Sequence, residues 1–401
     1  IEVRGDAQGG SFSADSDLSA VVSQLGQFVD FGDLQLVGRA ETRGNWKFDG
    51  DLLTMNVDSD YRGLSISRGS IPMMVEPELT TRADVRVCFD GPCVRRIESA
   101  AIQATSGADQ LLVRLKQGVD APGSDAVWPI MCRITGDLTQ WARRLSLDTP
   151  WQLAGDARVE AEGWVSNSQL EIPSWSGEIT NFVAAAGTTQ IVEPTVQCQG
   201  SLRGNAKTKT LELDSLQATS SIIAINSQDV QLSFRDGPLA LSGVLAFRGD
   251  GARLHDLLDP ASPQRMTGTV DGQLSFEPSG NTIRIDGTVT AQQFALYAPA
   301  PAGQPAVFVE GQQVGQEQLL WNEQSLMARL KANWNPGADT AELELLQVTG
   351  DEGTLDLHGS VAELTRQTQL QLEGNLQYDL DRLSRKLNAE RSSGIQLAGQ
   401  H

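Results

Sequence analysis

The chain has 401 residues, enough for two or three ordinary domains, and its 31 basic residues stand against 51 acidic ones, giving a net charge of −20. Nucleic-acid binding requires a basic patch that displaces counterions from phosphates, and no such cluster occurs, so nucleic acid is excluded as a partner. The same charge weakens docking onto anionic lipid headgroups. No run of about 18 apolar residues occurs, so the sequence predicts no membrane-spanning helix.

The sequence repeats itself. Val-Glu pairs recur with a spacing of 117 residues, at Val75-Glu76, Val192-Glu193 and Val309-Glu310. An L-x-G or M-x-G step recurs at Leu36–Gly38, Leu153–Gly155, Met266–Gly268 and Leu397–Gly399. A third motif, Ile/Leu-Gln-Ala/Val-Thr-Ser/Gly, occupies residues 102–106, 216–220 and 346–350. Units of this length predict a stacked array rather than one compact catalytic domain.

The motifs divide the chain into repeats. We expect residues 1–15 to end a preceding repeat, 16–134, 135–250 and 251–376 to form three repeats, and 377–401 to begin a further one. Since the chain starts without Met in a strand-like segment and stops just after the fourth L-x-G step, it is expected to be a fragment of a longer protein.

Each repeat is predicted to open with one short amphipathic helix. In the first, apolar residues fall at i, i+3, i+4 and i+7, with Ser16 or Asp17 as candidate cap: Leu18, Val21, Val22 and Leu25. A similar helical spacing of apolar residues begins at Leu138, Leu254 and Leu380. Helices of this length favour docking on a sheet over lying on a membrane.

Most of the remaining sequence alternates with a period of two. From Thr282 to Gln292, apolar or small residues alternate with polar ones, which is typical of a sheet with one solvated face. Asp236-Gly237-Pro238 separates two such segments and predicts a hairpin, as does the same tripeptide at Asp90–Pro92. The chain is therefore predicted to be mainly β, with five or six antiparallel strands and one helix per repeat.

One helix per repeat cannot cover the apolar face of such a sheet, and leaving that face wet costs roughly 25 cal/mol per Å². An outer-membrane barrel would carry aromatic girdles, but the chain has 3 Tyr and 8 Trp, and these are scattered. Immunoglobulin-like sandwiches lack the opening helix, and a parallel β-helix has a shorter repeat. The remaining architecture is one elongated sheet that curls across its width into a gutter with the apolar face inside.

The order of helix, L-x-G step, long alternating strands, Val-Glu-Pro and Leu-Gln-Ala-Thr segments resembles the AsmA-like and TamB-like envelope proteins. The resemblance implies a repeating β-groove, or β-taco, that acts as a bridge-like lipid conduit between membranes. It also implies a periplasmic location and a membrane anchor outside this chain. Implied partners are lipid acyl chains, the remaining repeats of the longer chain and membrane-embedded envelope proteins.

Catalytic motifs are missing from the sequence. It has no G-x-S-x-G elbow, no Gly-rich phosphate loop before a helix and no H-E-x-x-H, and its 3 histidines suggest no zinc site. We therefore expect no enzymatic activity, no cofactor and no metal. Cys88 and Cys93 flank a turn-like sequence and form a disulfide or remain isolated thiols; the sequence leaves both open.

Two functions remain: a lipid conduit, or a structural or adhesive rod of the envelope whose sheet closes on itself. A self-filled core would need many large aromatic side chains, but Phe, Trp and Tyr make up 5% of the chain, which favours the conduit. The residues predicted to line the groove are Ile283, Ile285, Val289, Val230, Leu232, Phe234, Leu239, Leu241, Leu153 and Val159.

Overall fold

The computed structural model describes residues 1–25, 32–69, 71–123, 125–144, 151–186, 189–233, 240–258, 262–299, 308–309, 312–313, 317–363 and 369–379. The chain is mainly β, as predicted: 21 strands form one antiparallel meander sheet, and a separate hairpin adds two short strands. The helices of the described residues are α1 (Leu18–Leu25), α2 (Leu138–Arg144) and α3 (Gly251–Leu258).

The chain divides into two compact units, Ile1–Lys207 and Thr208–His401, which we describe separately. The strands of the first unit are β1 (Glu2–Gly5), β2 (Gly9–Asp17), β3 (Leu34–Asp49), β4 (Leu52–Arg68), β5 (Ile71–Asp90), β6 (Cys93–Ser106), β7 (Asp109–Leu115), β8 (Val119–Asp120), β9 (Trp128–Asp137), β10 (Gln152–Val165), β11 (Gln169–Ala186) and β12 (Thr189–Asn205). Those of the second are β13 (Thr210–Thr219), β14 (Ile223–Ser233), β15 (Ala240–Asp250), β16 (Arg265–Ser279), β17 (Thr282–Pro299), β18 (Phe308–Val309), β19 (Gln312–Gln313), β20 (Glu317–Asn335), β21 (Thr340–Thr349), β22 (Gly353–Ala362) and β23 (Gln369–Tyr378).

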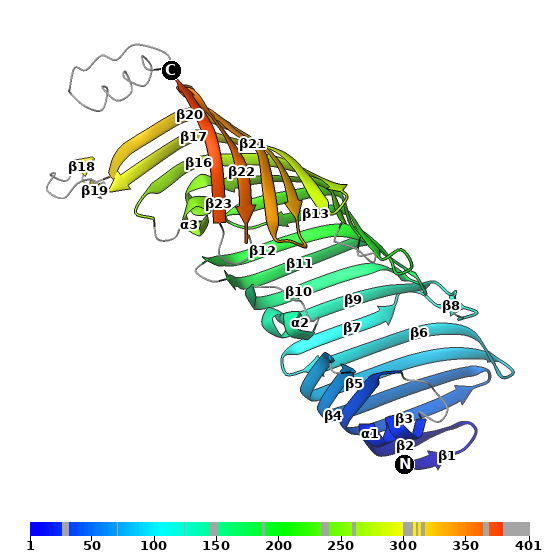
Figure 1. Cartoon of the computed structure of the whole chain (residues 1–401). Helices are drawn as coiled ribbons and strands as arrows, with labels where there is room; N and C mark the ends of the chain where they lie inside the picture. Colours follow the sequence, from blue (N-terminus) through cyan, green and yellow to red (C-terminus); the bar gives the residue numbers. More distant parts are fainter. Residues whose placement is uncertain are drawn as a thin grey trace. The chain divides into compact units, whose positions relative to one another are not determined.

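Within each unit the long strands pair in chain order, as Figure 1 shows. The predicted hairpin at Asp90–Pro92 is confirmed, since Asp90 pairs with Cys93 across a two-residue turn in which Gly91 has a φ of 58°. The second predicted hairpin, at Asp236–Pro238, lies outside the described residues.

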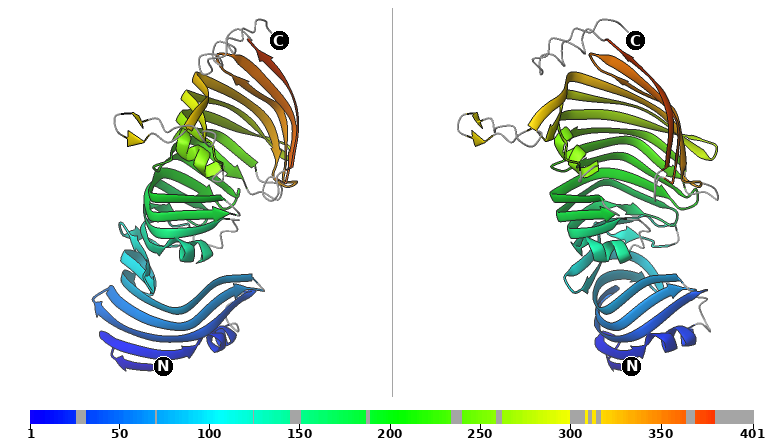
Figure 2. Two further views of the ribbon diagram at one scale, coloured as in Figure 1. Left: turned by 90° about the vertical axis from the view of Figure 1, so that its left-hand side faces the viewer. Right: turned by 60° about the vertical axis from the view of Figure 1, so that its left-hand side comes forward.

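The strong curl predicted for the sheet is not found. The sheet is neither closed nor strongly curled: in the described registers β1 pairs only with β2, and β23 only with β22. Strands of the first unit bow along their length instead (Figure 2). Each strand satisfies its backbone hydrogen bonds with its immediate neighbours, so the strand pairing itself does not require the sheet to wrap.

The predicted helices occur where the apolar phase places them. Each described helix is preceded by an aspartate whose Oδ1 accepts a backbone N–H of the first turn, as an N-cap does: Asp17 from Ser19 (2.9 Å), Asp137 from Thr139 (2.7 Å) and Asp250 from Arg253 (3.1 Å). The expected cap at Asp17 is therefore confirmed. The fourth predicted helix, from Leu380, and the fourth L-x-G step lie outside the described residues.

The glycine of each described L-x-G step forms a β-bulge. The register shifts at this glycine in all three repeats, and its φ is 129° at Gly38, 133° at Gly155 and 123° at Gly268. The facing strand also has a positive φ next to the shift, of 60° at Gly63, 52° at Asn181 and 51° at Gln293. A bulge of this kind bends the strand and increases its twist. The motif therefore marks a recurring β-bulge in the backbone rather than a side-chain packing site.

The Val-Glu-Pro motif inverts the expected alternation. Its valines face solvent and its glutamates are buried: Val75 is 63% and Val192 60% exposed, against 4% for Glu76 and 1% for Glu193. After the proline of the first copy the phase shifts by one residue, because Glu78 is exposed again. The third copy lies largely outside the described residues.

Few side chains are fully buried. Among the described residues the buried apolar positions are Ala40, Leu64, Cys88, Val119, Ala157, Ala184, Ile283 and Ala332. Most other described positions are partly or fully exposed, so within each unit the sheet is largely a single layer with two accessible faces.

The bulge glycines predict a sharp difference between two alanine substitutions. Gly155→Ala places a Cβ 2.8 Å from the carbonyl oxygen of Thr180 at a φ of 133°, which we expect to cost about 1–3 kcal/mol of stability. At Gly123 the nearest neighbour of a new Cβ is 3.9 Å away, so Gly123→Ala is the matched control and stays within about 0.5 kcal/mol of the parent. Denaturant midpoints measure both. Equal midpoints for the two variants would contradict a structural role for the bulge.

Candidate functional site

The second unit carries a mainly apolar face whose two central rows contain no charged residue. Residues that face each other across successive strands form one row from β13 to β23, and no member of this row is charged: Ala218, Ile225, Phe247, Gly272, Val289, Ala328, Val348, Leu355 and Leu376. The next row on the same face runs through Leu216, Ser227, Leu245, Leu274, Gly287, Leu330, Leu346, Leu357 and Gly374. Paired residues point to the same side of an antiparallel sheet, so both rows lie on one face.

The opposite face of the same strands is polar. One residue along from the first row, the paired residues are Asn226, Ala246, Gln273, Thr288, Arg329, Gln347, Asp356 and Asn375. On β17 the predicted alternation is confirmed, since Ile283 is 1% exposed and the neighbouring Arg284 is an exposed residue.

The first unit has an equivalent face. Its central row crosses β1–β7 and β9–β12 without a charged residue: Val3, Phe12, Gly44, Val57, Ala83, Ile102, Val113, Cys132, Ala161, Trp175 and Gly200. Burial on this face raises the pKa of the Cys132 thiol, which keeps the row uncharged.

Several of the predicted lining residues lie on these faces. Val289 stands in the central row of the second unit, and Ile285 pairs with Phe276 and Ala332 in a parallel row. Val159 of the first unit pairs with Ile134 and Gly177.

Other predicted lining residues lie near the ends of strands. Leu232 pairs with Leu211 and Leu241, and Val230 pairs with Leu213. Leu153 lies beside α2, whose Thr139 Oγ1 donates a hydrogen bond to its carbonyl (2.9 Å). Phe234 and Leu239 fall outside the described residues.

Large side chains on the apolar face lie over glycines of the adjacent strand. A Cβ added to Gly272 would be 2.3 Å from the Phe247 ring, and one added to Gly287 would be 2.4 Å from Leu274. In the first unit, Gly44 is covered by Phe12 in the same way, at 2.5 Å. The face is therefore smooth, because the bulk of a large residue occupies the space above a missing side chain.

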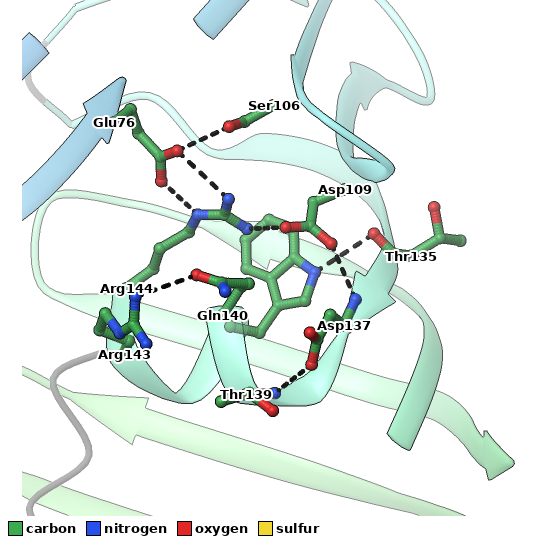
Figure 3. A network of polar contacts seen from close by, with 10 residues as sticks. Glu76, Ser106, Asp109, Thr135, Asp137, Thr139, Gln140, Arg143 and Arg144 are labelled. Carbon is green, nitrogen blue, oxygen red and sulfur yellow. Dashed lines mark hydrogen bonds and ion pairs between the residues drawn. The ribbon is translucent and has the colours of Figure 1, made fainter. Parts of the chain in front are cut away.

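A polar network tethers α2 at one margin of the first unit's face (Figure 3). Arg144 Nε donates to Glu76 Oε1 and its Nη1 to Asp109 Oδ2 at 2.8 Å, so one guanidinium joins α2 to β5 and β7. Ser106 Oγ donates to Glu76 Oε2 at 2.6 Å, and the Asp137 backbone N–H donates to Asp109 Oδ1 at 2.7 Å.

The network also fixes an aromatic side chain. The Arg144 guanidinium stacks over the Trp141 ring, 4.8 Å from its centroid, and Trp141 Nε1 donates to the carbonyl of Thr135 at 3.2 Å. Burial raises the pKa of Glu76, but hydrogen bonds from Arg144 and Ser106 outweigh it, and the net shift is below the ordinary value of 4.5. The Glu76 carboxylate is therefore held ionised by the Arg144 guanidinium beside it.

The cysteines of the β5–β6 hairpin are not joined. Cys88 pairs with Arg96 and Cys93 with Asp90, so the register does not place the two cysteines opposite each other. The Cys88 thiol donates to Glu98 Oε1 at 3.3 Å, and all four cysteines of the chain are free.

The network residues were missed as a site by sequence reasoning. Glu76 and Ser106 belong to two motifs that served only to mark the repeat, and Arg144 lies in a predicted helix without an assigned role. The sequence could have indicated the network, because the glutamate of one motif and the serine of another recur together and are followed by an arginine at the end of the predicted helix. A recurring charged residue beside an apolar strand position indicates such a tether.

The tether predicts an acid-sensitive contribution to stability. Arg144→Met leaves two buried carboxylates without their cation and is expected to cost about 3–5 kcal/mol at neutral pH. Because the pKa of Glu76 is lowered on folding, the ion pair contributes fully above pH 4.5 and is lost as pH falls through the lowered value. Unfolding midpoints of parent and variant should therefore converge in acid.

The adjacent exposed Arg143, which donates only to Gln140 at 3.3 Å in the described contacts, supplies the control Arg143→Met. This variant removes only the smallest of the interactions that lower the Glu76 pKa, so its unfolding midpoint should stay close to that of the parent at every pH. Parallel pH profiles for Arg144→Met and the parent would contradict the assigned ion pair.

Comparison with protein-family models, with curated proteins and with solved structures finds no match. In the described part of the chain, no helix combines the length and apolarity that crossing a membrane requires.

Proposed function

We propose that this chain is a segment of a bridge-like conduit that carries phospholipid or other lipids along an apolar groove between membranes of the cell envelope. The observation that carries the proposal is the pair of central rows, which cross nine strands in one unit and eleven in the other without a charged residue. A continuous apolar lane is what an acyl chain requires.

The dimensions of the lane suit lipid. Neighbouring strands lie about 4.8 Å apart, so the nine strands of the second unit offer a lane of about 38 Å. One leaflet of a bilayer is about 15 Å of hydrocarbon, half of the core thickness. An acyl chain therefore finds apolar contact over its whole length, while its headgroup remains in water beside the sheet.

The uncovered face also has an energetic consequence. Each Å² of apolar surface that an acyl chain covers contributes roughly 25 cal/mol, so a bound lipid replaces the missing second layer of the sheet. In this proposal the β-groove of about 117 residues per repeat is the uncovered apolar face, along which the lipid lies. The segment works in the periplasm, joined to further repeats and to a membrane anchor outside this chain, with membrane-embedded envelope proteins as terminal partners.

The alternative is a structural or adhesive rod without lipid. A rod must bury the same face within protein, and the small number of fully buried side chains among the described residues favours the conduit. The two functions differ in what a charge on the apolar face would do.

Two substitutions at neighbouring positions of β17 separate these functions. Ile285→Asp places a carboxylate on the lane, where its desolvation opposes the passage of acyl chains by several kcal/mol, so lipid occupancy should fall while the fold persists. Arg284→Asp lies on the polar face and removes an exposed ion pair with Asp286 (3.1 Å) that contributes little, so it should be nearly silent. Native mass spectrometry of protein from its envelope measures lipid occupancy, and thermal unfolding measures the fold.

Photo-crosslinking residues at the same two positions provide an independent readout. A conduit captures lipid at position 285 and not at 284. Capture at neither position, together with unfolding of Ile285→Asp, would contradict the conduit and support a rod with a packed core.

A further inference from the structure

The polar face of the second unit carries a hollow of about 820 Å³ on β21, β22 and β23. These strands pair in order beyond β20 (Figure 1). In β21 a β-bulge places Glu344 and Leu345 opposite His358 alone, and a bulge bends its strand. The polar side chains around the hollow are those of Glu342, Glu344, His358, Ser360, Gln371 and Glu373.

The hollow is negatively charged. Of the described residues that line it, three are glutamates, one is a histidine and none is Lys or Arg. Glu344 Oε1 accepts a hydrogen bond from Asn333 Nδ2 at 2.6 Å, and His358 Nε2 lies 3.8 Å from Glu373 Oε2. A positively charged group that entered the hollow would therefore meet several carboxylates at once.

The neighbouring strand β20 forms a positively charged ridge on the same face. Its exposed Arg329 and Lys331 pair across to Gln347 and Leu345 of β21. Among the described residues neither of the two cations forms an ion pair. Met327, two positions before Arg329 on this face, is 43% exposed. The face thus places a ridge of positive charge, with an apolar side chain, directly beside the hollow.

We propose that this polar face of β20–β23 is an interface between two copies of this chain, related by a two-fold axis that runs along β21 in the plane between the two sheets. Since β20 and β22 flank β21, rotation about this axis brings β20 of each copy over β22 of the other. Lys331 of each copy then enters the partner's hollow beside the partner's Glu373, which lies in the same row, and Arg329 faces the partner's Asp356. The contact is isologous, so it is made twice.

A second copy suits this face because the face carries charges of both signs. A free cation or a basic peptide would match the hollow, but it would also meet the positive ridge one strand away. An anionic surface would match the ridge and would meet the carboxylates. In the two-fold arrangement each ridge meets a hollow, and complementarity of this kind gives an interface its specificity.

The size of the face predicts a weak dimer. Four strands about 4.8 Å apart and about eight residues of 3.4 Å each give about 500 Å² per copy, or about 1,000 Å² in total. That area is the lower limit for a specific interface, so we expect micromolar association. The net charge of −20 opposes association at low ionic strength. At physiological salt the screening length is about 8 Å, which reduces repulsion between distant groups.

Sedimentation of the whole chain at physiological salt, at concentrations up to about 100 μM, tests the interface. The parent should dimerise as its concentration rises. The ridge variant Arg329→Glu/Lys331→Glu and the hollow variant Glu342→Lys/Glu373→Lys should each weaken self-association at least about tenfold, because like charges then face each other. An equimolar mixture of the two variants should form a heterodimer, since each altered surface then meets the opposite charge.

Arg248→Glu is the matched control. It reverses an exposed arginine on the same face of the same unit, where Arg248 forms an ion pair with Asp271 of β16, outside β20–β23. This variant should dimerise like the parent. Circular dichroism and unfolding midpoints verify that every variant is folded.

Three results would overturn the proposal. The first is a parent that remains monomeric over the whole concentration range. The second is a dimer that persists in both charge-reversed variants, because such a dimer must use another surface, such as the apolar face. The third is a mixture of the ridge and hollow variants without a heterodimer, which would show that ridge and hollow do not meet.

Discussion

The structure depends on one constraint: a sheet with a continuous apolar face and almost no second layer to cover it. Backbone hydrogen bonds between neighbouring strands satisfy the polar groups of the main chain. The apolar side chains of the sheet, in contrast, have almost no second layer of protein packed on them. Three short helices in the described residues cover only margins. Part of the apolar surface that a domain normally buries therefore stays in contact with water. Any molecule that covered this surface would gain the corresponding hydrophobic free energy.

The repeated motifs determine where the strands of this uncovered sheet bend and where charged side chains point. The L-x-G glycines bend the strands, and the Val-Glu-Pro segments reverse the phase so that a glutamate points to the apolar side. In the first repeat that glutamate, Glu76, meets Arg144 from the following helix, and both lie within a mostly buried network. The polar tether thus lies where the helix already excludes water. The open part of the face carries no charge in its central rows, so tether and lane do not interfere.

Sequence reasoning predicted what depends on local periodicity. The period of two predicted the strands and the two faces of β17, and the phase of leucines predicted the helices at Leu18 and Leu138. It predicted the wrong curvature, because side-chain alternation shows which residues share a face but not how far the sheet bends across its width. It also missed the inversion at Glu76, since alternation alone places the valine inside; only contacts between distant segments reveal that the glutamate is paired there.

A margin closed by helices and an open centre have different chemistry, and this determines what each can bind. At the margin, a cation and a carboxylate lie together in a mostly buried environment. A protein segment that carries the complementary charge binds there favourably, whereas a hydrocarbon chain would leave the buried charge without a partner. At the centre, rows such as Ile225, Phe247 and Val289 offer no polar partner. Contact with hydrocarbon is therefore favourable there, and burial of a charged group is not. The helices that the structure describes therefore lie against the margins of the sheet, and the proposed apolar ligand would lie along its uncharged centre.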